Sequence, residues 1–313
     1  MGTFNIQHST FNFQPIFIAG PTAVGKSEVA LQLAERMGGE IISVDSMQVY
    51  RRLDIGTAKP TLADRGRVPH HLIDICDLTE SFDAAQFARL AHRAVAEIQS
   101  RGHVPILCGG TGLYFKAFLE GLDEMPSADA KLRAELAAMP LDKVLEELRE
   151  RDPVTYEKID KKNPRRVIRA VEVIRLTGKR ISEVQAPKSK VQGPKLKFYC
   201  LIRRPDDLRR RIDDRVDVMF TRGLVDETRE LLKRGLEQNK TAMQAIGYRQ
   251  VVEHLRGERS LVETVELVKI RTRQFAKRQL TWFRAQKKLE WIELEPDEPL
   301  DNILQRIGAA VSA

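Results

Sequence analysis

Gly20-Pro21-Thr22-Ala23-Val24-Gly25-Lys26-Ser27 decides the fold, because this stretch has the spacing G-x-x-x-x-G-K-[ST] of a phosphate-binding loop. The apolar run 16–19 before it predicts a buried strand, and the run 27–36 after it has the periodicity of an amphipathic helix. Strand, glycine loop and helix in this order are the setting that the motif requires. We therefore expect a site for a chain of phosphates at this point of an α/β structure.

The residue types in the loop suit phosphate binding. Gly20 and Gly25 permit backbone conformations that a side chain would block, so the loop amides can point inward at phosphate oxygens. The helix that follows adds its free N–H groups and the positive end of its dipole. Lys26 supplies a positive charge and Ser27 a hydroxyl that can ligate Mg²⁺. All of 20–27 is expected to hold phosphates, but the motif names neither ATP nor the reaction.

Apolar runs predict further strands, and two polar residues follow their ends. The strands are expected at 40–45, 70–75, 104–108, 196–202 and 291–294. Asp45 ends one of them, and ligands in open α/β sheets bind beyond the carboxyl ends of strands. Thr111 lies in a second glycine turn, which is either a plain turn or part of the same pocket. The predicted fold class is α/β, a P-loop NTPase-like core with a parallel sheet flanked by helices.

A change of character near residue 125 divides the chain. From about 129 to 186 the periodicity is helical with no strand signal, and strand character returns at 196. We expect a core made of 15–124 and 196–313, with basic helices in its C-terminal part, and an all-helical insertion at 125–195. Residues 1–14 lack the basic start and apolar centre of a signal peptide and are expected to form a mobile tail.

Composition narrows the class of protein. The 313 residues carry a formal net charge of +8, which indicates either a polyanionic partner or charge used for solubility. Cys76, Cys108 and Cys200 are far apart, as is typical of a reducing compartment, and we expect a cytoplasmic protein. No apolar run approaches the roughly 20 residues of a membrane span. Adjacent strand residues face opposite ways, so His70 and His71 are expected to have structural roles rather than to share a metal.

The positive charge is concentrated. No acidic residue occurs between Lys269 and Lys288, and a second basic cluster, 161–166, opens a predicted helix. Solvated helix faces usually mix charges of both signs, so an acid-free face of this length favours a nucleic-acid footprint. Trp282 and Phe283 interleave with these charges and are either core residues or platforms for a base.

Several motifs, taken in order, resemble those of the tRNA dimethylallyltransferases, and the match runs from about Ile16 to Leu294. The motifs are Gly20–Ser27, Asp45–Tyr50, Asp54–Pro60, Gly109–Tyr114, Gly247–Gln250 and the signature Lys277–Arg284. The resemblance implies transfer of a dimethylallyl group from dimethylallyl diphosphate to N6 of the adenine at tRNA position 37, beside the anticodon. It also implies Mg²⁺ as cofactor, with the phosphate loop holding the diphosphate donor in place of ATP.

The resemblance assigns roles in catalysis to particular residues. Lys26 and Arg215 stabilise the departing diphosphate, and Thr111 hydrogen-bonds its departing oxygen. The alternative for Arg215 is a surface ion pair with Asp213 or Asp214. Asp45 takes the N6 proton as general base, and its alternative role is a ligand of Mg²⁺.

The resemblance and the basic clusters together predict the RNA contacts. Gln48 suits adenine recognition because a side-chain amide can pair with the N6/N7 edge. The insertion resembles a mobile lid over the anticodon stem, and we expect a monomer. The full set of expected tRNA contacts is Asp45, Ser46, Met47, Gln48, Thr111, Arg133, Arg165, Arg166, Val167, Ile168, Arg169, Gly247, Tyr248, Arg249, Gln250, Lys277, Arg278 and Arg284.

Three other functions are compatible with parts of this pattern. An ATP-dependent small-molecule or nucleotide kinase shares the loop and the sheet but gives the basic helix no purpose. A prenyltransferase acting on free AMP or ADP keeps the chemistry but needs neither the insertion nor the basic C-terminal third. A non-catalytic RNA-binding protein with a vestigial loop would not need Lys26, Ser27, Asp45 and Thr111 intact.

Overall fold

The chain forms two compact units in the computed structural model, which describes residues 14–121, 126, 129–184, 197–286 and 289–312. The first unit, called the core unit here, comprises Met1–Phe118 and Gly193–Ala313, and the second, the insertion, comprises Leu119–Gln192. The expected N-terminal tail lies outside the described residues, apart from Gln14.

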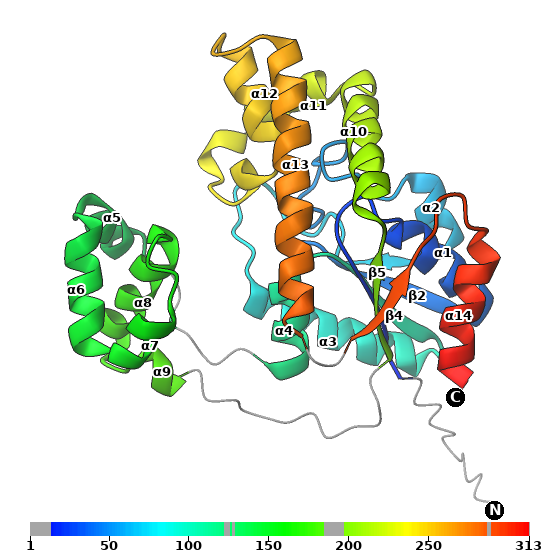
Figure 1. The fold of residues 1–313 in the computed structure, drawn as a ribbon, viewed down its shortest axis with the longest axis horizontal. Helices are drawn as coiled ribbons and strands as arrows, with labels where there is room; N and C mark the ends of the chain where they lie inside the picture. The colour runs from blue at the N-terminus through cyan, green and yellow to red at the C-terminus, as the bar shows by residue number, and fades with distance from the viewer. Residues whose placement is uncertain (1–13, 122–125, 127–128, 185–196, 287–288, 313) are drawn as a thin grey trace, which may run out of the picture. The chain divides into compact units, whose positions relative to one another are not determined.

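A six-stranded parallel sheet of order β3-β2-β4-β1-β5-β6 lies at the centre of the core unit (Figure 1). All residues of β1 and β2 are buried, as expected for strands covered on both faces. This confirms the predicted parallel α/β sheet and puts the phosphate loop at the end of a central strand. The strands are β1 Ile16–Ala19, β2 Gly39–Val44, β3 His70–His71, β4 Val104–Gly109, β5 Lys197–Ile202 and β6 Glu290–Glu293.

Helices cover the sheet, and the longest of them, α13, lies in the C-terminal part of the chain. Helix α10 packs along α13, and α14 packs on α1 (Figure 1). Asp83 caps α3 and Ser260 caps α13, each in a reciprocal capping box. The core helices are α1 Lys26–Met37, α2 Leu62–Arg67, α3 Ala84–Ser100, α4 Gly112–Glu120, α10 Pro205–Thr221, α11 Leu224–Leu232, α12 Tyr248–Leu255, α13 Leu261–Arg284 and α14 Leu300–Ser312, with short turns η1 Leu236–Gln238 and η2 Ala242–Gln244.

The third predicted strand is shorter than its apolar run. β3 ends at His71, because Leu72 and Asp74 adopt φ angles of 60° and 56°, which an extended strand does not allow. Residues 74–76 then bond to the segment after Asp45, with Ile75 N donating to Val49 O at 2.9 Å. Sequence periodicity did not reveal this change of pairing partner.

The insertion has its own apolar core and no strand among its described residues. Asn163 caps α8 and Pro164 is its first residue, so the basic cluster 161–166 does open a helix. Asp152 is wholly buried, caps α7 and accepts hydrogen bonds from Ser182. The helices are α5 Ala130–Ala138, α6 Leu141–Arg151, α7 Pro153–Lys158, α8 Pro164–Thr177 and α9 Ile181–Val184.

A buried carboxylate makes hydrogen bonds at the N-terminal end of β2, which is the end of the sheet opposite the phosphate loop. Glu40, at the start of β2, is 2% exposed and accepts from Arg101 Nη2 at 2.8 Å. It also pairs with His71 Nε2 at 2.6 Å and His103 Nδ1 at 2.7 Å. His71 therefore has a structural partner. Burial alone would raise the pKa of Glu40, but the hydrogen bonds from Arg101 and the two histidines outweigh it and lower the pKa to about 2.

We expect Glu40→Gln to lower the free energy of unfolding by about 3 kcal/mol at pH 7. A depressed carboxyl pKa stabilises the fold fully above the ordinary value of 4.5, and this contribution is lost as pH falls from 4.5 towards 2. Urea unfolding should therefore show that the difference in free energy of unfolding between wild type and variant is smaller at pH 3 than at pH 7. Glu97→Gln, which removes an exposed partner of Arg93, is the control and should change little. A gap that does not depend on pH would contradict the role of the charge.

Candidate active site

The phosphate loop has the backbone that its glycines were expected to allow. Gly20 and Gly25 have φ angles of 146° and 110°, and a Cβ on Gly20 would lie 2.5 Å from the carbonyl oxygen of Leu201. Lys26 begins α1, and its Nζ donates to the Pro21 carbonyl at 2.7 Å across the loop. The lysine therefore closes the loop and brings its ammonium to the side where phosphates are expected.

Two arginines that the sequence analysis missed donate hydrogen bonds to backbone carbonyl oxygens of the loop. Arg203 Nε donates to the Val24 carbonyl at 2.9 Å, and Arg211 Nε donates to the Ala23 carbonyl at 3.0 Å. These carbonyl oxygens would repel a phosphate if they turned inward, so the arginines favour the binding conformation. The several arginines at 203–211 indicate a site for anions or carbonyl oxygens nearby. Helical spacing alone does not show which of them reach the loop.

Gln279, on α13, is a third residue that sequence reasoning missed. It is 8% exposed, its Oε1 accepts from Thr22 N at 2.8 Å, and its Nε2 donates to Gly110 O at 2.9 Å. One side chain thus joins the phosphate loop to the second glycine turn. Gln279 lies in a basic motif, Lys277–Arg284, whose charge pattern gives no sign that an uncharged member contacts the loop.

Asp45 and Thr111 meet at the ends of β2 and β4. Asp45 Oδ1 accepts from Met47 N at 2.8 Å and from Gln48 N at 3.3 Å. Among the described residues, nothing donates a hydrogen bond to the other carboxylate oxygen of Asp45. Thr111 N donates to Val44 O at 3.2 Å, and its Oγ1 accepts from Ser46 N at 3.2 Å. The glycine turn is therefore built into the same strand end as Asp45, not a plain connection.

The charges of Lys26, Arg215 and Asp45 interact. Burial is the main cause that lowers the pKa of Lys26 to about 8, and repulsion by Arg215 adds to it while Asp45 opposes it. Burial also lowers the pKa of Arg215, and Asp45 opposes that shift. The carboxylate and both cations therefore lie within electrostatic range of one another.

The alternative role for Arg215 is not found in the described part of the chain. There it forms no ion pair with Asp213 or Asp214, whereas Asp213 lies 3.4 Å from Arg273 Nε. Arg215 is half-buried, and its largest attractive interaction is with Asp45.

The Gln48 amide has protein partners. Its Oε1 accepts from Ser43 Oγ at 2.9 Å, and its Nε2 donates to Thr57 O at 3.2 Å. The side chain thus holds the loop 53–60 beside Asp45. Recognition of an adenine edge by Gln48 would require exchange of these bonds.

The predicted RNA contacts at 247–250 are mostly internal. Tyr248 is wholly buried, and its hydroxyl donates to Glu227 at 2.5 Å and accepts from Gly56 N at 3.1 Å. Gln250 is also buried, and it accepts from the amide of Gly247 at 2.9 Å. Only Arg249 exposes its side chain here, so the other three position the backbone instead of facing RNA.

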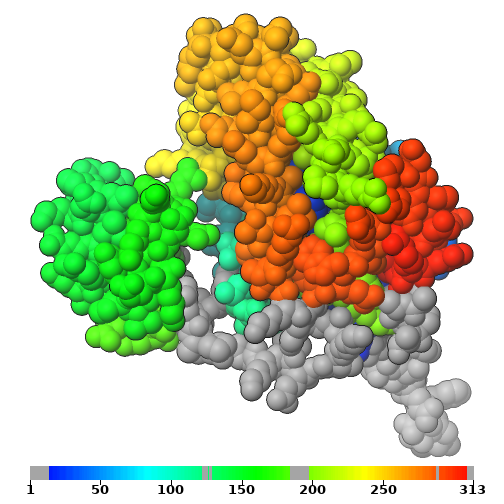
Figure 2. All heavy atoms as spheres, in the orientation of Figure 1, coloured from blue at the N-terminus to red at the C-terminus, as the bar shows by residue number. Residues whose placement is uncertain are grey.

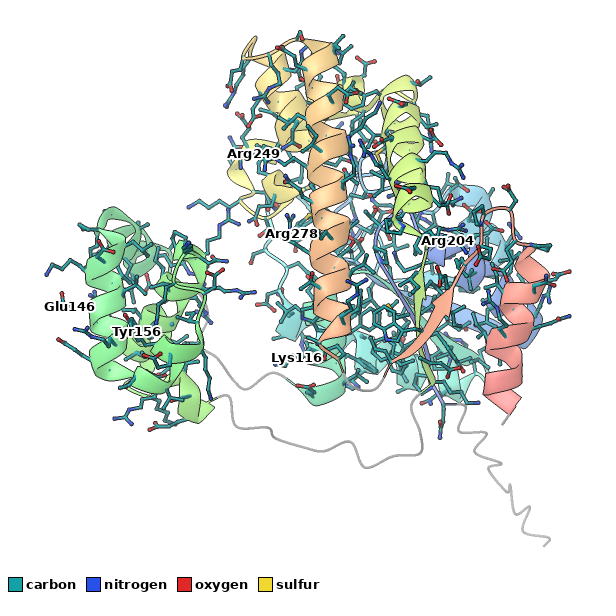
Figure 3. The ribbon with its side chains drawn as sticks, viewed as in Figure 1. Lys116, Glu146, Tyr156, Arg204, Arg249 and Arg278 are labelled. Carbon is teal, nitrogen blue, oxygen red and sulfur yellow. The ribbon has the colours of Figure 1, made fainter. Side chains whose placement is uncertain are left out.

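The basic face of α13 is smaller than its sequence indicated. Lys269 pairs with Asp217 at 2.8 Å and Arg273 with Asp213, both on α10, so the neighbouring helix neutralises this end. The exposed cations that remain on α13 are Arg271, Lys277, Arg278 and Arg284. Figure 2 shows the surface of α13 exposed along one face of the core unit, and Figure 3 labels Arg278 on α13 and Arg249 on α12.

The two aromatics of α13 have internal roles. Phe283 is wholly buried and packs edge-on against Phe115, with ring centroids 6.2 Å apart. Trp282 is half-buried and lies so close to Gly112 that a Cβ there would be 2.3 Å from the indole. Phe283 is therefore a core residue, and Trp282 supports the second glycine turn.

In the insertion, two of the expected RNA contacts pair with a buried carboxylate, and one of them, Arg133, is nevertheless exposed. Arg133 Nε and Arg169 Nη1 donate to Glu172 at 2.9 and 2.7 Å, and Glu172 is wholly buried. Burial would raise the pKa of Glu172, but these bonds outweigh it and lower the pKa. Arg165 and Arg166 are exposed at the start of α8.

Two apolar residues of the same expected RNA contact lie inside the insertion. Val167 is wholly buried in its core, and Ile168 packs against that core. The side chain of Val167 therefore does not reach RNA, a correction that follows from its position on the inner face of α8.

The protein ligands near the phosphate loop can hold Mg²⁺ only if phosphate oxygens of the substrate complete its coordination. Within the described residues no group of three His, Cys, Asp or Glu side chains could hold a metal ion. Ser27 is exposed in the first turn of α1 and offers one hydroxyl. Magnesium usually keeps waters and takes few protein ligands plus substrate phosphate oxygens, which this arrangement permits. None of the helices described is long and apolar enough to cross a membrane.

Comparison with known proteins gives consistent matches. Residues 48–286 match the family model described as IPP transferase. The tRNA dimethylallyltransferase 1 of Trichlorobacter lovleyi is 47% identical over 283 residues, which cover 88% of this chain and 92% of the relative. The tRNA dimethylallyltransferase of Halorhodospira halophila is 48% identical over 276 residues, covering 86% of this chain and 89% of that protein.

Solved structures agree with these matches. A full-length tRNA isopentenylpyrophosphate transferase from Bacillus halodurans superposes with a TM-score of 0.72 at 40% identity, covering 96% of this chain and 95% of that one. A eukaryotic dimethylallyltransferase described as acting on tRNA superposes with a TM-score of 0.79 at 30% identity, covering 96% of this chain and 78% of that one.

Proposed function

This chain belongs to the IPP transferase family, and on that premise we propose that it prenylates tRNA. The specific proposal is transfer of a dimethylallyl group from dimethylallyl diphosphate to N6 of the adenine at position 37. The products are N6-isopentenyladenosine and diphosphate. The enzyme acts in the cytoplasm as a monomer, with Mg²⁺ bound by Ser27 and the diphosphate oxygens.

One observation carries this proposal. A phosphate loop, two half-buried cations and a carboxylate oxygen that accepts no hydrogen bond from the described residues lie within electrostatic range of one another, where β1, β2 and α10 meet. Lys26 and Arg215 suit a leaving diphosphate, and Asp45 suits an amine that must lose a proton. A kinase needs the phosphate loop and the cations, whereas transfer to an exocyclic amine also uses the carboxylate.

The bond to the donor breaks as diphosphate departs. In the proposed reaction the allylic carbon–oxygen bond cleaves, and the electron pair leaves with the diphosphate. Lys26, the loop amides and Arg215 stabilise the charge that develops on it, and Thr111 hydrogen-bonds the departing oxygen. Magnesium, when bound, adds Lewis-acid stabilisation of the same charge.

The new bond forms at N6 of adenine. This nitrogen is a poor nucleophile, because its lone pair is delocalised into the ring. Asp45 accepts the N6 proton as the carbon–nitrogen bond forms, which is typically worth roughly 10²–10⁴-fold in rate. Oδ1 is held by Met47 N and Gln48 N, and this leaves Oδ2 to take the proton.

The adenine must leave its stack in the anticodon loop to reach Asp45. The cost is about a few kcal/mol and is lowest where bases are already unpaired. Exposed cations on the core unit and the insertion hold the RNA backbone during this step. We assign this role to Arg165, Arg166, Arg249, Lys277, Arg278 and Arg284, with Arg133 and Arg169 shaping the insertion around Glu172.

Mass analysis of nucleosides tests this function. Unmodified tRNA is incubated with enzyme, dimethylallyl diphosphate and Mg²⁺, digested to nucleosides and searched for N6-isopentenyladenosine, and oligonucleotides from a partial digest show whether the group is at position 37. Parallel incubations replace the tRNA by AMP and the donor by ATP. Prenylated tRNA with unmodified AMP supports the proposal. Prenylated AMP, or phosphate transfer from ATP, would show that the acceptor or the reaction is assigned wrongly.

Replacing Arg165 and Arg166 by alanine is expected to weaken tRNA binding about tenfold near physiological salt. The reason is that each lost phosphate contact removes a share of counterion release, so the slope of log K against log salt should fall by about one to two. Titrations of labelled tRNA at several salt concentrations measure both quantities. Arg89→Ala/Arg93→Ala on α3 removes equal charge elsewhere and serves as control. An unchanged slope in the Arg165/Arg166 variant would exclude this face from the footprint.

A further inference from the structure

An arginine-lined cavity lies in the core unit on residues that none of the site assignments uses. Its volume is about 170 Å³, and Leu78 and Leu231 form its buried apolar part. The charged residues around it are exposed. The full lining is Arg51, Arg52, Asp77, Leu78, Thr79, Leu231 and Arg234.

The charges in this cavity do not balance. Asp77 is its only carboxylate and lies 3.1 Å from Arg51 Nη1, so these two neutralise each other. Arg52 and Arg234 form no side-chain hydrogen bond or ion pair with the residues that the structure describes. Two arginines of the lining are therefore left without a carboxylate within ion-pair distance, although Glu230 lies within electrostatic range of Arg234, and the Thr79 hydroxyl adds a donor. Guanidinium groups that share one concave site repel each other, and a bound phosphate would relieve that repulsion.

Backbone hydrogen bonds hold the walls in place. Arg51 N donates to Cys76 O at 2.9 Å, beside the bridge between Tyr50 and Cys76. Arg52 has a φ of 68°, a conformation that few residues other than glycine adopt. The side chain of Asn239 adds a further bond, from Nδ2 to Leu78 O at 2.8 Å. The arginines are thus presented from a preformed surface.

The cavity adjoins the candidate acceptor site along the chain. Arg51 follows Asp45 by six positions in the sequence, and a fully extended chain of that length spans about 20 Å. Neighbouring phosphates of one strand follow at about 3.4 Å along a helix axis, so the cavity lies within about six nucleotides of the reacting adenine. Asn239, which fastens the cavity wall, also begins the segment that leads to Arg249.

We propose that this cavity binds a backbone phosphate of the RNA substrate, with Arg52 and Arg234 as the ligands and Arg51 fixed by Asp77. This inference rests on the proposed function, because it supposes that RNA enters the site. Phosphate contacts fix the register of an RNA without reading its sequence. The cavity would therefore help to place the adenine at Asp45 in any tRNA that is accepted.

The test is the full-length double variant Arg52→Ala/Arg234→Ala with unmodified tRNA. The dissociation constant should rise about tenfold near physiological salt, and the slope of log K against log salt should fall by about one. The KM for dimethylallyl diphosphate and the rate at saturating tRNA should stay unchanged. Arg89→Ala/Arg93→Ala removes the same charge from α3 and should leave the slope as it is.

Unchanged tRNA affinity and slope in the double variant would overturn the inference, and so would an equal loss in the control. A second arm measures thermal protection by inorganic phosphate. If the variant loses this protection but binds tRNA normally, the cavity holds a small anion and the RNA assignment is wrong. Failure of the proposed function would look different, since wild-type enzyme would then leave tRNA unmodified whatever its affinity.

Discussion

Asp45→Ala is expected to lower the rate of prenyl transfer by about 10²–10⁴-fold, while tRNA affinity changes little. The loss follows from removal of the group that takes the N6 proton, and general-base catalysis is typically worth this much. Single-turnover transfer at saturating donor and tRNA isolates the chemical step from binding. Filter binding or anisotropy with the same tRNA measures affinity separately.

Asp45→Asn separates the proposed base from a structural role. An asparagine oxygen can still accept from Met47 N and Gln48 N, so the turn at the end of β2 should persist. The rate should nevertheless fall as far as in the alanine variant, because an amide cannot take the proton. Activity within tenfold of wild type would disprove the base assignment. Recovery of the rate at high Mg²⁺ would show instead that Asp45 is a metal ligand.

The sheet and the strand ends could be predicted because both depend on local patterns. The glycine loop follows an apolar strand, and Asp45 follows another, so parallel topology alone puts them at one edge. The helix caps at Asn163 and Ser260 likewise depend only on a few consecutive residues. These features need no knowledge of distant contacts.

The supports of the site could not be predicted because their partners are far apart in sequence. Gln279 bonds to Thr22, which lies 257 residues earlier, and Arg211 bonds to Ala23 from α10. Tyr248 resembles a surface motif residue, yet it is buried against Glu227 and Gly56. The charge pattern of α13 overestimated its basic face for the same reason. The acids that neutralise Lys269 and Arg273 lie on another helix.

The low pKa of Lys26 predicts a distinctive pH profile for use of the donor. The ammonium attracts diphosphate only while protonated, and its pKa in the free enzyme is about 8, mainly because of burial. The kcat/KM for dimethylallyl diphosphate should therefore be level below pH 8 and fall about tenfold per pH unit above it. Bound diphosphate favours the ammonium form, so kcat at saturating donor should stay level to higher pH.

Two substitutions show whether Lys26 causes this decline. Lys26→Met should lower kcat/KM by about 10²–10³-fold, as loss of one charge-stabilising donor does elsewhere, and should abolish the decline above pH 8. Lys26→Arg keeps its charge to above pH 12 and should also give a level profile, whatever rate its different geometry permits. If the decline persists in both variants, another group titrates and the charge on Lys26 does not limit donor binding. If it disappears in both, the half-buried Lys26 ammonium, within electrostatic range of Arg215 and Asp45, is the group on which capture of the diphosphate depends.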